Sequence, residues 1–551
     1  MMAMTLRSAS LLAALVPLLL STTARRPAPI DPNRLRAHVG FLADDLLEGR
    51  GPGTRGGLLA ERYVAAALAS AGVAPAGENG TYFQKVPLVG VTTRPASTLS
   101  FAGGGGTLVP KLLDDAVVWS EALEEKTSFE APEVLFAGYG IEAPEWRWND
   151  YPADVSGKLL LMLVGDPPAT PAEPELFAGR ALTYHGRWTR KLELAASKGA
   201  RGVLLVHTEA SAGYGWSVVR GSWSGERSQL PAAPGERALR LAGWVTEGAA
   251  QRLMALAGAD LAALRAAAGR RGFTPVPLPL KATVELESGL RRFEASNVAG
   301  RIAGTDPSRA EEAVLFGAHV DHLGIGTPDA RGDAIYNGAV DDASGVACLL
   351  EVARTLAAGG GLPRSVLFLG FTAEEQGLKG SGWYASHPLV PPGRSAALVN
   401  LDGAKPWGEV EDFTLMGADR SPELARIAAE TARDLRFRQV PDAHPEKGYF
   451  YRSDHFSLAR VGVPCINLES GHTLRGKPPE AGAALEASYR DTRYHRPADQ
   501  VDASWDFGAL AQYATVAREL GRRIAASPGL PRWRSGDEFE AARLASRAEG
   551  R

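Results

Sequence analysis

The sequence Phe316-Gly-Ala-His319-Val-Asp321-His322 places a His-x-Asp motif at the end of an apolar run that begins at Ala313. Three later segments also carry acidic side chains after an apolar run or at the start of a helix. They are Asn337-Gly-Ala-Val-Asp341-Asp342-Ala-Ser-Gly345, Phe371-Thr-Ala-Glu374-Glu375-Gln-Gly377 and Val399-Asn-Leu-Asp402. Open α/β sheets bind ligands at the carboxyl ends of their strands, so we expect these groups to converge.

These side chains are the types that a divalent metal site needs. Histidine and carboxylate ligands without thiolates suit Zn²⁺ or a similar ion. A hydrolytic site for two ions also needs one oxygen donor shared between them and a base that stays off the metal. The adjacent pair Glu374 and Glu375 can divide these tasks, and two like charges beside an apolar strand are costly unless a cation neutralises them. The sequence therefore predicts a two-metal hydrolase site.

Each motif also has a simpler interpretation when it is taken alone. A His-x-Asp pair is common, and an acidic pair often begins a solvated helix. One of Asp341 and Asp342 is explained as a helix cap, which leaves the other free to bridge metal ions. It is the combination of motifs that favours a metal site.

The surroundings of the motifs predict the fold class. After Asn297 the sequence alternates between strand and helix patterns up to about residue 526. We expect strands at 365–371, 396–401 and 463–468, and helices at 343–356, 421–435 and 507–524. Such alternation indicates an α/β fold with a mixed, mostly parallel sheet and helices on both faces.

Composition limits the classes of protein that need to be considered. A chain of 551 residues is too long for one core, so two or three domains are expected. A net charge of −3 gives no reason to expect nucleic acid as a partner. Cys348 and Cys465 both lie in apolar segments, which predicts buried free thiols.

The N-terminus has the layout of a secretory signal peptide. Residues 1–7 carry one positive charge, residues 11–20 are apolar, and small residues occupy 21–24. The apolar run is short for a membrane span, although an uncleaved anchor is the alternative. We expect a secreted or periplasmic protein with no stable membrane insertion after cleavage.

Together the motifs resemble the co-catalytic zinc exopeptidases of the aminopeptidase Y type, whose relatives include glutamate carboxypeptidase II and the non-catalytic transferrin receptor. The pieces that carry the resemblance are His319-x-Asp321, Asp341-Asp-Ala-Ser-Gly345, Glu374-Glu375, Asn400-Leu-Asp402, Ser453-Asp-His455 and Tyr494-His495. Two further pieces, Phe136-Ala-Gly-Tyr-Gly140 and Asp154-Val-Ser-Gly-Lys158, are similar to the protease-associated (PA) domain that many members carry as an insert. The resemblance implies the zinc exopeptidase fold with a smaller, β-rich α/β insert.

The resemblance divides the chain into five segments. The insert is assigned to a stretch that lacks paired acidic motifs and ends near a Pro-rich segment. A Gly-rich stretch at 49–57 is expected to be a flexible break, and the charged C-terminal end is expected to be frayed. The segments are a signal peptide (1–24), the N-terminal part of the peptidase domain (25–130), the PA domain (131–285), the main part of the peptidase domain (286–527) and a charged tail (528–551).

The resemblance also implies a set of metal ligands for two Zn²⁺ ions per chain. His319 and Asp402 are expected to bind one ion, Glu375 and His495 the other, and Asp341 to bridge them. One departure from the family is Gly403, which follows Asp402 where methionine is common.

The remaining roles are catalytic. By the same resemblance, Glu374 is expected to act as general base and then acid, while Asp321 orients the ring of His319. Tyr494 is expected to stabilise the oxyanion, with Tyr451 as the rival. The extra histidines His322 and His455 are taken as residues that support the ligands or are structural, and not as ligands themselves.

These roles predict a dinuclear zinc aminopeptidase that acts on peptides. A carboxypeptidase or dipeptidase of the same fold is the alternative, because four arginines lie near the motifs: Arg452, Arg490, Arg493 and Arg496. A glutaminyl cyclase would use one zinc ion and does not need the full ligand set. A receptor-like binding protein would lack ligands, and none is missing here. For the insert, the hypothesis is that it covers the mouth of the active site or selects substrates by length.

Overall fold

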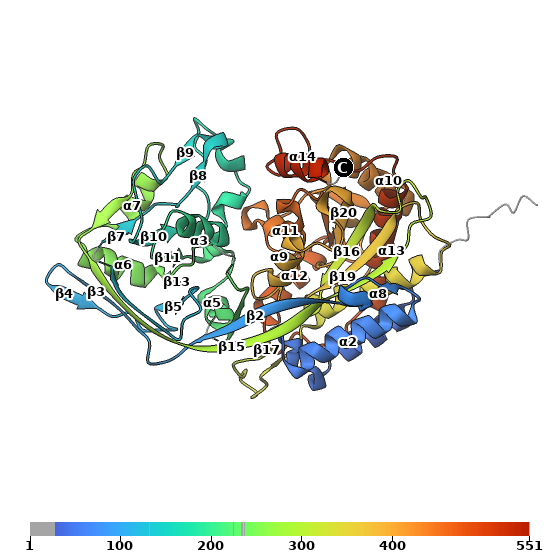
Figure 1. Cartoon of the computed structure of the whole chain (residues 1–551), viewed down its shortest axis with the longest axis horizontal. Coiled ribbons are helices and arrows are strands. Elements are labelled where there is room, and N and C mark those ends of the chain that lie inside the picture. Colours follow the sequence, from blue (N-terminus) through green and yellow to red (C-terminus); the bar gives the residue numbers. More distant parts are fainter. Residues whose placement is uncertain (1–27, 132, 224, 233–234, 236, 550–551) are drawn as a thin grey trace, which may run out of the picture.

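The computed structural model describes residues 28–131, 133–223, 225–232, 235 and 237–549. The predicted signal peptide lies outside the described residues. The chain forms a larger part built on a central sheet and a smaller part around a second sheet (Figure 1). The predicted fold class, α/β with a mixed sheet, is confirmed.

Parallel strands form the middle of the central sheet. Along the sheet the order is β12-β2-β15-β19-β16-β20-β23-β21-β22. The bounds are β2 Phe83–Thr93, β12 Arg227–Gln229, β15 Lys281–Ile302, β16 Ala313–His319, β19 Ser365–Phe371, β20 Ser395–Asn400, β21 Asp412–Met416, β22 Arg438–Val440 and β23 Cys465–Ser470. Strands β19, β16, β20 and β23 are parallel, whereas β15 and β21 run antiparallel to their neighbours within this group.

Helices cover both faces of this sheet. Alternate residues of β19 show this, because Val366 and Phe368 pack into one hydrophobic cluster while Leu367 and Leu369 pack into another. The first cluster includes residues of α1 (Pro32–Leu42), α2 (Arg55–Ser70), α8 (Ser344–Ala357), α10 (Pro422–Leu435) and α13 (Phe507–Ala526). The second includes residues of α9 (Lys379–Ser386) and α11 (His455–Arg460). Strands buried on both faces are typical of parallel sheets, as the sequence predicted.

The smaller part contains a second, six-stranded sheet, in the order β14-β7-β10-β11-β13-β5. Its strands are β5 Ala116–Trp119, β7 Val134–Phe136, β10 Leu159–Leu163, β11 Gly202–His207, β13 Leu241–Thr246 and β14 Val276–Leu278. Its helices are α3 Trp188–Ser197, α4 Glu209–Ala212, α5 Trp216–Trp223, α6 Glu247–Leu256 and α7 Leu261–Ala268. Because β5 belongs to this sheet, the smaller part includes residues that precede 131, the expected start of the insert.

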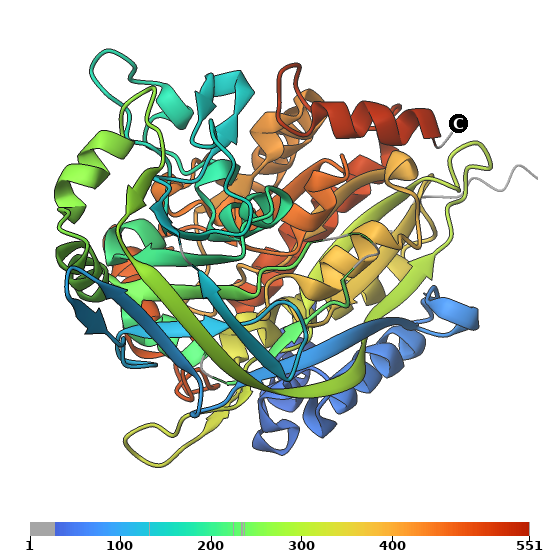
Figure 2. The same cartoon turned by 60° about the vertical axis from the view of Figure 1, so that its left-hand side comes forward.

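The long strand β15 joins the two parts. Its first residues pair with β3 (Thr98–Gly103) on one side and β6 (Lys126–Ala131) on the other, while residues 288–298 pair with β2 and residues 298–302 with β19. Figures 1 and 2 show it as one long bent strand that passes from the smaller part into the larger. The remaining short strands are β1 Ala74–Pro75, β4 Gly106–Leu108, β8 Glu142–Ala143, β9 Trp148–Asn149, β17 Gly324–Ile325 and β18 Ile335–Tyr336.

Two expectations about flexible segments are wrong. The Gly-rich stretch at 49–57 is packed against the core, and the Arg50 side chain is 1% exposed and donates hydrogen bonds to the carbonyls of Leu42, Val320, Asn337 and Gly338. The C-terminal end is also folded. Trp533 and Phe539 are buried in the second cluster, and α14 (Glu540–Glu549) packs on residues 392–394.

Two other observations concern cysteines and membrane spans. Cys348 and Cys465 are buried free thiols, as predicted. Among the residues that the structure describes, no helix has the length and apolar character needed to cross a membrane.

Candidate metal centre

The predicted site residues meet at one edge of the central sheet. His319 ends β16, Glu374 and Glu375 follow β19, and Asp402 follows β20. Since these three strands are parallel and adjacent, their carboxyl ends lie side by side. All four residues line a cavity of about 130 Å³, together with Asp341, Tyr494 and His495.

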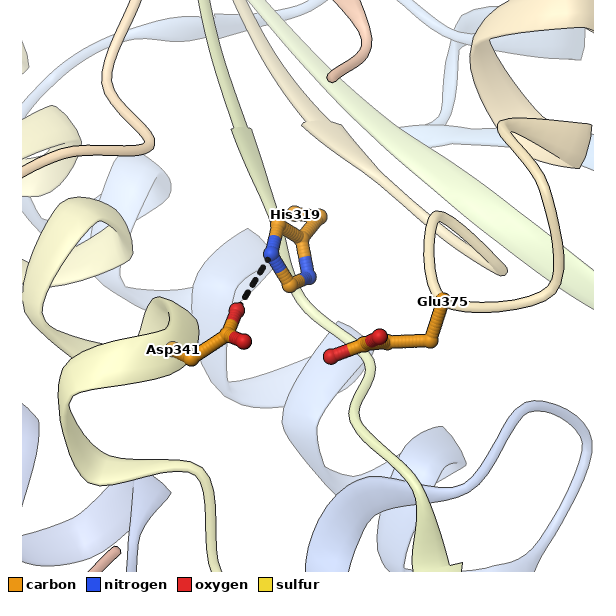
Figure 3. Close-up of side chains that lie close together, drawn as sticks. All are labelled: His319, Asp341 and Glu375. Carbon is orange, nitrogen blue, oxygen red and sulfur yellow. Dashed lines mark ion pairs between the residues drawn. The ribbon is translucent and has the colours of Figure 1, made fainter. Parts of the chain in front are cut away.

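Asp341 lies between two histidines that come from distant parts of the chain. Its Oδ1 is 3.1 Å from Nε2 of His319, and its Oδ2 is 3.3 Å from Nε2 of His495. Figure 3 shows Asp341 and Glu375 on opposite sides of the His319 ring. One carboxylate that presents each oxygen to a different imidazole is the geometry expected of a ligand that bridges two ions.

The other two carboxylates lie on the outer sides of this pair. Oε2 of Glu375 is 3.2 Å from Nε2 of His495, and Oδ1 of Asp402 is 3.8 Å from Nε2 of His319. The opposite oxygen of Glu375, Oε1, is 2.7 Å from Nδ1 of His322. The two ends of the site therefore have matching donor sets, each with one histidine, one carboxylate and a share of Asp341.

This donor set fits two divalent cations. Three carboxylates and two imidazoles direct their polar atoms at a common space, and the side chain of His319 is only 1% exposed. Such a concentration of acidic groups in a buried site is unfavourable without cations. Nitrogen and oxygen donors without a thiolate match the preferences of Zn²⁺.

A second group of polar side chains holds the donors in place. Asp342 accepts hydrogen bonds from the backbone N–H of His319 (3.2 Å) and of Gly345 (3.0 Å), so it is the member of the Asp341–Asp342 pair that caps backbone groups. Asp499 accepts from the backbone N–H of Val340 and of Asp341. Burial raises the pKa of Asp499 to about 6.

Asp321 lies behind His319 rather than in the cavity. Nδ1 of His319 is 3.1 Å from the backbone carbonyl of Asp321 and 3.9 Å from its carboxylate. The carboxylate instead accepts a hydrogen bond from the backbone N–H of Glu374 at 3.1 Å. The ring is thus oriented mainly by the carbonyl, while the side chain of Asp321 also fixes Glu374.

Glu374 differs from Glu375 in its surroundings. Among the described residues, no cationic nitrogen lies within 4.0 Å of its carboxylate, although the side chain lines the cavity. Burial raises the pKa of Glu374 well above its usual range, the charge of His319 opposes this, and the charge of Glu375 adds to it. A carboxylate that faces the cavity without a fixed partner is suited to exchange protons.

The two tyrosine candidates lie in different places. Tyr494 lines the cavity, and its ring stacks on His495 with 3.9 Å between ring centroids. Tyr451 donates its hydroxyl to Glu538 at 2.8 Å and does not line the cavity. The structure therefore brings Tyr494, and not Tyr451, to the metal centre.

The four arginines near the motifs also lie in different places. Arg452 and Arg490 line the cavity, whereas Arg493 pairs with Asp502 at 2.6 Å and Arg496 is exposed. His455 is buried outside the cavity lining, and burial lowers its pKa to about 3. This agrees with a structural role for His455.

Sequence reasoning missed two supporting residues. Asp499 follows the predicted ligand His495 by four residues in the same loop, and that spacing was the available signal. Arg50 is separated from the motifs by more than 250 residues, so no local pattern could reveal that it holds the carbonyls of Val320 and Gly338.

Comparison with known proteins agrees with this arrangement. Residues 297–520 match peptidase family M28. This M28 region begins within β15 and ends within α13, and it contains every donor described above. For this part of the chain, the predicted enzyme class, a peptidase, is confirmed.

Relatives include leucine aminopeptidase 1 of Trichoderma harzianum, 36% identical over 193 residues, which cover 33% of this chain and 46% of the relative. Leucine aminopeptidase 1 of Coccidioides posadasii is 28% identical over 249 residues, which cover 43% of this chain and 58% of that relative. The match thus spans about half the length of these relatives. The structure of the aminopeptidase from Aneurinibacillus sp. strain AM-1 aligns with a TM-score of 0.51 and 19% identity, over 91% of this chain and 96% of that one, which supports the fold.

Proposed function

We propose that this protein is a secreted, dinuclear zinc aminopeptidase that removes N-terminal residues from peptides. The observation that carries the proposal is the position of Asp341, whose two oxygens face His319 and His495 at 3.1 and 3.3 Å. The match to peptidase family M28 and the leucine aminopeptidases among the relatives support the same activity.

In this proposal five residues hold two Zn²⁺ ions. His319 and Asp402 would bind one, Glu375 and His495 the other, and Asp341 would bridge them. When bound, the ions would supply Lewis-acid polarisation of the scissile carbonyl and would lower the pKa of the attacking water.

The chain's own residues would move the proton and hold the developing charge. Glu374 accepts the proton of the attacking water and then returns it to the leaving amine. Its backbone is fixed for this by the hydrogen bond from its N–H to Asp321. The hydroxyl of Tyr494 donates to the oxyanion as it forms. Because its ring stacks on His495, that hydroxyl is held beside a metal ligand.

A free N-terminal amine would be bound by carboxylates in the cavity. Glu374 faces the cavity beside the donors. Arg452 favours the second candidate function, a carboxypeptidase or dipeptidase, since it lines the cavity without a carboxylate within 4.0 Å among the described residues and could pair with a substrate carboxylate. Arg490 is already paired with Glu486 at 2.6 Å.

The test combines metal analysis with peptides blocked at one end. We expect two zinc ions per chain and cleavage that is abolished by N-terminal acetylation of the peptide. Cleavage that survives acetylation and fails on C-terminal amides would establish the carboxypeptidase alternative. Bound metal with no cleavage of any peptide would instead indicate a binding protein.

The role of Glu374 has its own test. Glu374→Gln should retain the same zinc content, because Glu374 is not a ligand in this proposal, and should lose about 10²- to 10⁴-fold in kcat. Glu125→Gln, a change of an exposed glutamate at a surface bend, is the matched control. Unchanged turnover of Glu374→Gln would remove Glu374 from the mechanism.

We also propose that the smaller part acts as a protease-associated insert that selects peptides by length. It meets the larger part beside the cavity, where Arg452 donates to the carbonyl of Ala212 at 2.9 Å and the backbone N–H of Leu182 donates to the carbonyl of Pro445. A protein that cleaves long and short peptides at equal rates would contradict this role.

A further inference from the structure

The wall of the cavity beyond the metal centre is polar and charged. Besides the metal donors, it is lined by Lys405, Tyr449, Arg452, Glu469, Glu486, Tyr489 and Arg490. None of these is needed to hold an ion or to move a proton in the proposed mechanism. They are therefore candidates for the surface that contacts the substrate's side chain.

Most of the charges on this wall are already satisfied within the protein. Glu486 is 2.7 Å from Nζ of Lys405 and 2.6 Å from Nε of Arg490. Its two oxygens are thus shared between two cations, and only about 9% of its side chain is exposed. These three residues form a fixed network, which leaves them little freedom to bind a substrate charge.

Glu469 is the acidic residue of this wall that stands outside the network. Among the residues that the structure describes, no lysine, arginine or histidine nitrogen lies within 4.0 Å of its carboxylate, and its one hydrogen bond comes from Nδ2 of Asn467 at the long distance of 3.5 Å. The residue is only partly exposed, yet it follows directly after the buried residue Leu468 of β23. A half-buried carboxylate without a firm partner loses hydration and gains little in return.

The backbone places this carboxylate next to the metal centre. Gly403 follows the ligand Asp402, and a Cβ on Gly403 would lie 2.6 Å from Cγ of Glu469 and 2.6 Å from the carbonyl oxygen of Leu468. Any larger residue at 403 would therefore displace Glu469. The glycine that departs from the family pattern is what lets Glu469 approach the ligand.

We infer that Glu469 is a specificity-determining residue that receives a basic side chain, lysine or arginine, of the substrate's N-terminal residue. The inference rests on the proposed aminopeptidase activity. A residue held with its amine at the metal centre would extend its side chain along the adjoining wall, where Glu469 supplies a charge partner that the protein itself does not. The ion pair would be shielded from solvent, which strengthens it.

The charge balance of the wall is consistent with this assignment. Burial raises the pKa of Glu469 to about 7, while Lys405 and Arg490 oppose the shift and Glu486 and Asp442 add to it. The carboxylate is therefore poorly compensated by the fixed network. A cationic ligand would provide the missing compensation.

The test compares two tripeptides, Lys-Ala-Ala and norleucine-Ala-Ala, whose first residues share a carbon chain and differ in the terminal ammonium group. We expect kcat/KM to be about 10- to 100-fold higher for the lysine peptide, the range for one hydrogen bond to a charged group. Glu469→Gln keeps the size of the side chain and should bring this ratio close to one. Glu469→Lys should prefer Glu-Ala-Ala over Lys-Ala-Ala.

The outcomes separate the inference from the function on which it rests. A structural role for Glu469 would lower turnover of both peptides equally, so an unchanged ratio in Glu469→Gln overturns the inference, as does a wild-type protein with no preference for lysine. Glu480→Gln, at an exposed site outside the cavity, is the control and should leave the ratio unchanged. Failure to cleave any peptide with a free amine would overturn the proposed function and the inference with it.

Discussion

Replacing Asp499 tests whether the metal centre depends on groups that never touch a metal ion. Asp499 is fully buried and accepts hydrogen bonds from the backbone N–H of Val340 (3.1 Å) and of Asp341 (3.2 Å), and from the hydroxyl of Tyr489 (3.3 Å). It therefore fixes the backbone that carries Asp341, the proposed bridging ligand. Asp499→Ala removes all three acceptor contacts, whereas Asp499→Asn keeps one acceptor oxygen.

The size of the effect follows from these contacts. A buried donor left without an acceptor costs about 1–3 kcal/mol. Asp499→Ala leaves three such donors, and water from the cavity can reach some of them. We therefore expect this variant to lose about 3–5 kcal/mol of unfolding free energy. For Asp499→Asn we expect about 1–2 kcal/mol. Loss of a group that orients a metal ligand typically lowers metal affinity by about 10- to 100-fold, and we expect this for the alanine variant.

Two assays separate the two effects. Urea unfolding in the presence of a chelator gives the stability of the metal-free chain, and competition with a fluorescent chelator gives the zinc affinity. Asp260→Asn is the control, because Asp260 caps the exposed start of α7 and asparagine caps equally well. An alanine variant that stays within 1 kcal/mol of the parent and binds zinc equally well would refute the reasoning.

Three further predictions concern residues outside the cavity. Arg50→Met removes the guanidinium hydrogen bonds to four carbonyls and should lower the unfolding free energy by about 3–5 kcal/mol in urea denaturation. A loss under about 1 kcal/mol would contradict the packing of residues 49–57. Burial raises the pKa of Glu61 to about 7, so the folded state holds this proton to a higher pH than the unfolded state. The stabilisation from this proton is complete below about pH 4.5 and is lost as the pH rises to about 7. Glu61→Gln should therefore flatten the decline in stability that thermal unfolding measures from about pH 4.5 to about pH 7.5. Trp533→Ala should lower the unfolding free energy by about 3 kcal/mol, measured by thermal unfolding, and should expose α14 to protease. An unchanged digestion pattern would show that α14 docks without Trp533.

The sequence alone predicted the central sheet well because its strands are buried on both faces. The predicted strand at 365–371 has no charged residue and is apolar after Ser365, and β19 has those bounds in the structure. Helix starts were equally clear where a cap preceded proline. Ser421 accepts from the backbone N–H of Leu424, and α10 begins at Pro422 as expected. Local sequence chemistry determines both kinds of feature.

The convergence of the predicted metal donors could be foreseen for a related reason. Each of His319, Glu375 and Asp402 lies at or just after the end of a recognisable strand, so topology alone brings them together. The donor His495 needed the family resemblance, because it lies in a loop where the backbone adopts a positive φ of 55°. No periodic pattern identifies a residue of that kind.

Long-range packing accounts for what could not be predicted. The stretch at 49–57 has the composition of a flexible loop, yet Arg50 makes it part of the core through contacts more than 250 residues away. The C-terminal segment is highly charged, but Trp533 and Phe539 anchor it. Tertiary contacts can override local composition, and no local pattern in a single sequence identifies such contacts.

The strand β15 has a consequence for how the two parts of this protein can be separated. Insertions usually enter a host through flexible connections, which is why they can be removed without harm to the host. Here a cut at residue 285 would fall inside a single strand of 22 residues that is hydrogen-bonded in both parts. Excision would expose a new sheet edge, with the aggregation risk that such edges bring. Engineering of this protein should therefore retain β15 whole and alter the smaller part through surface substitutions.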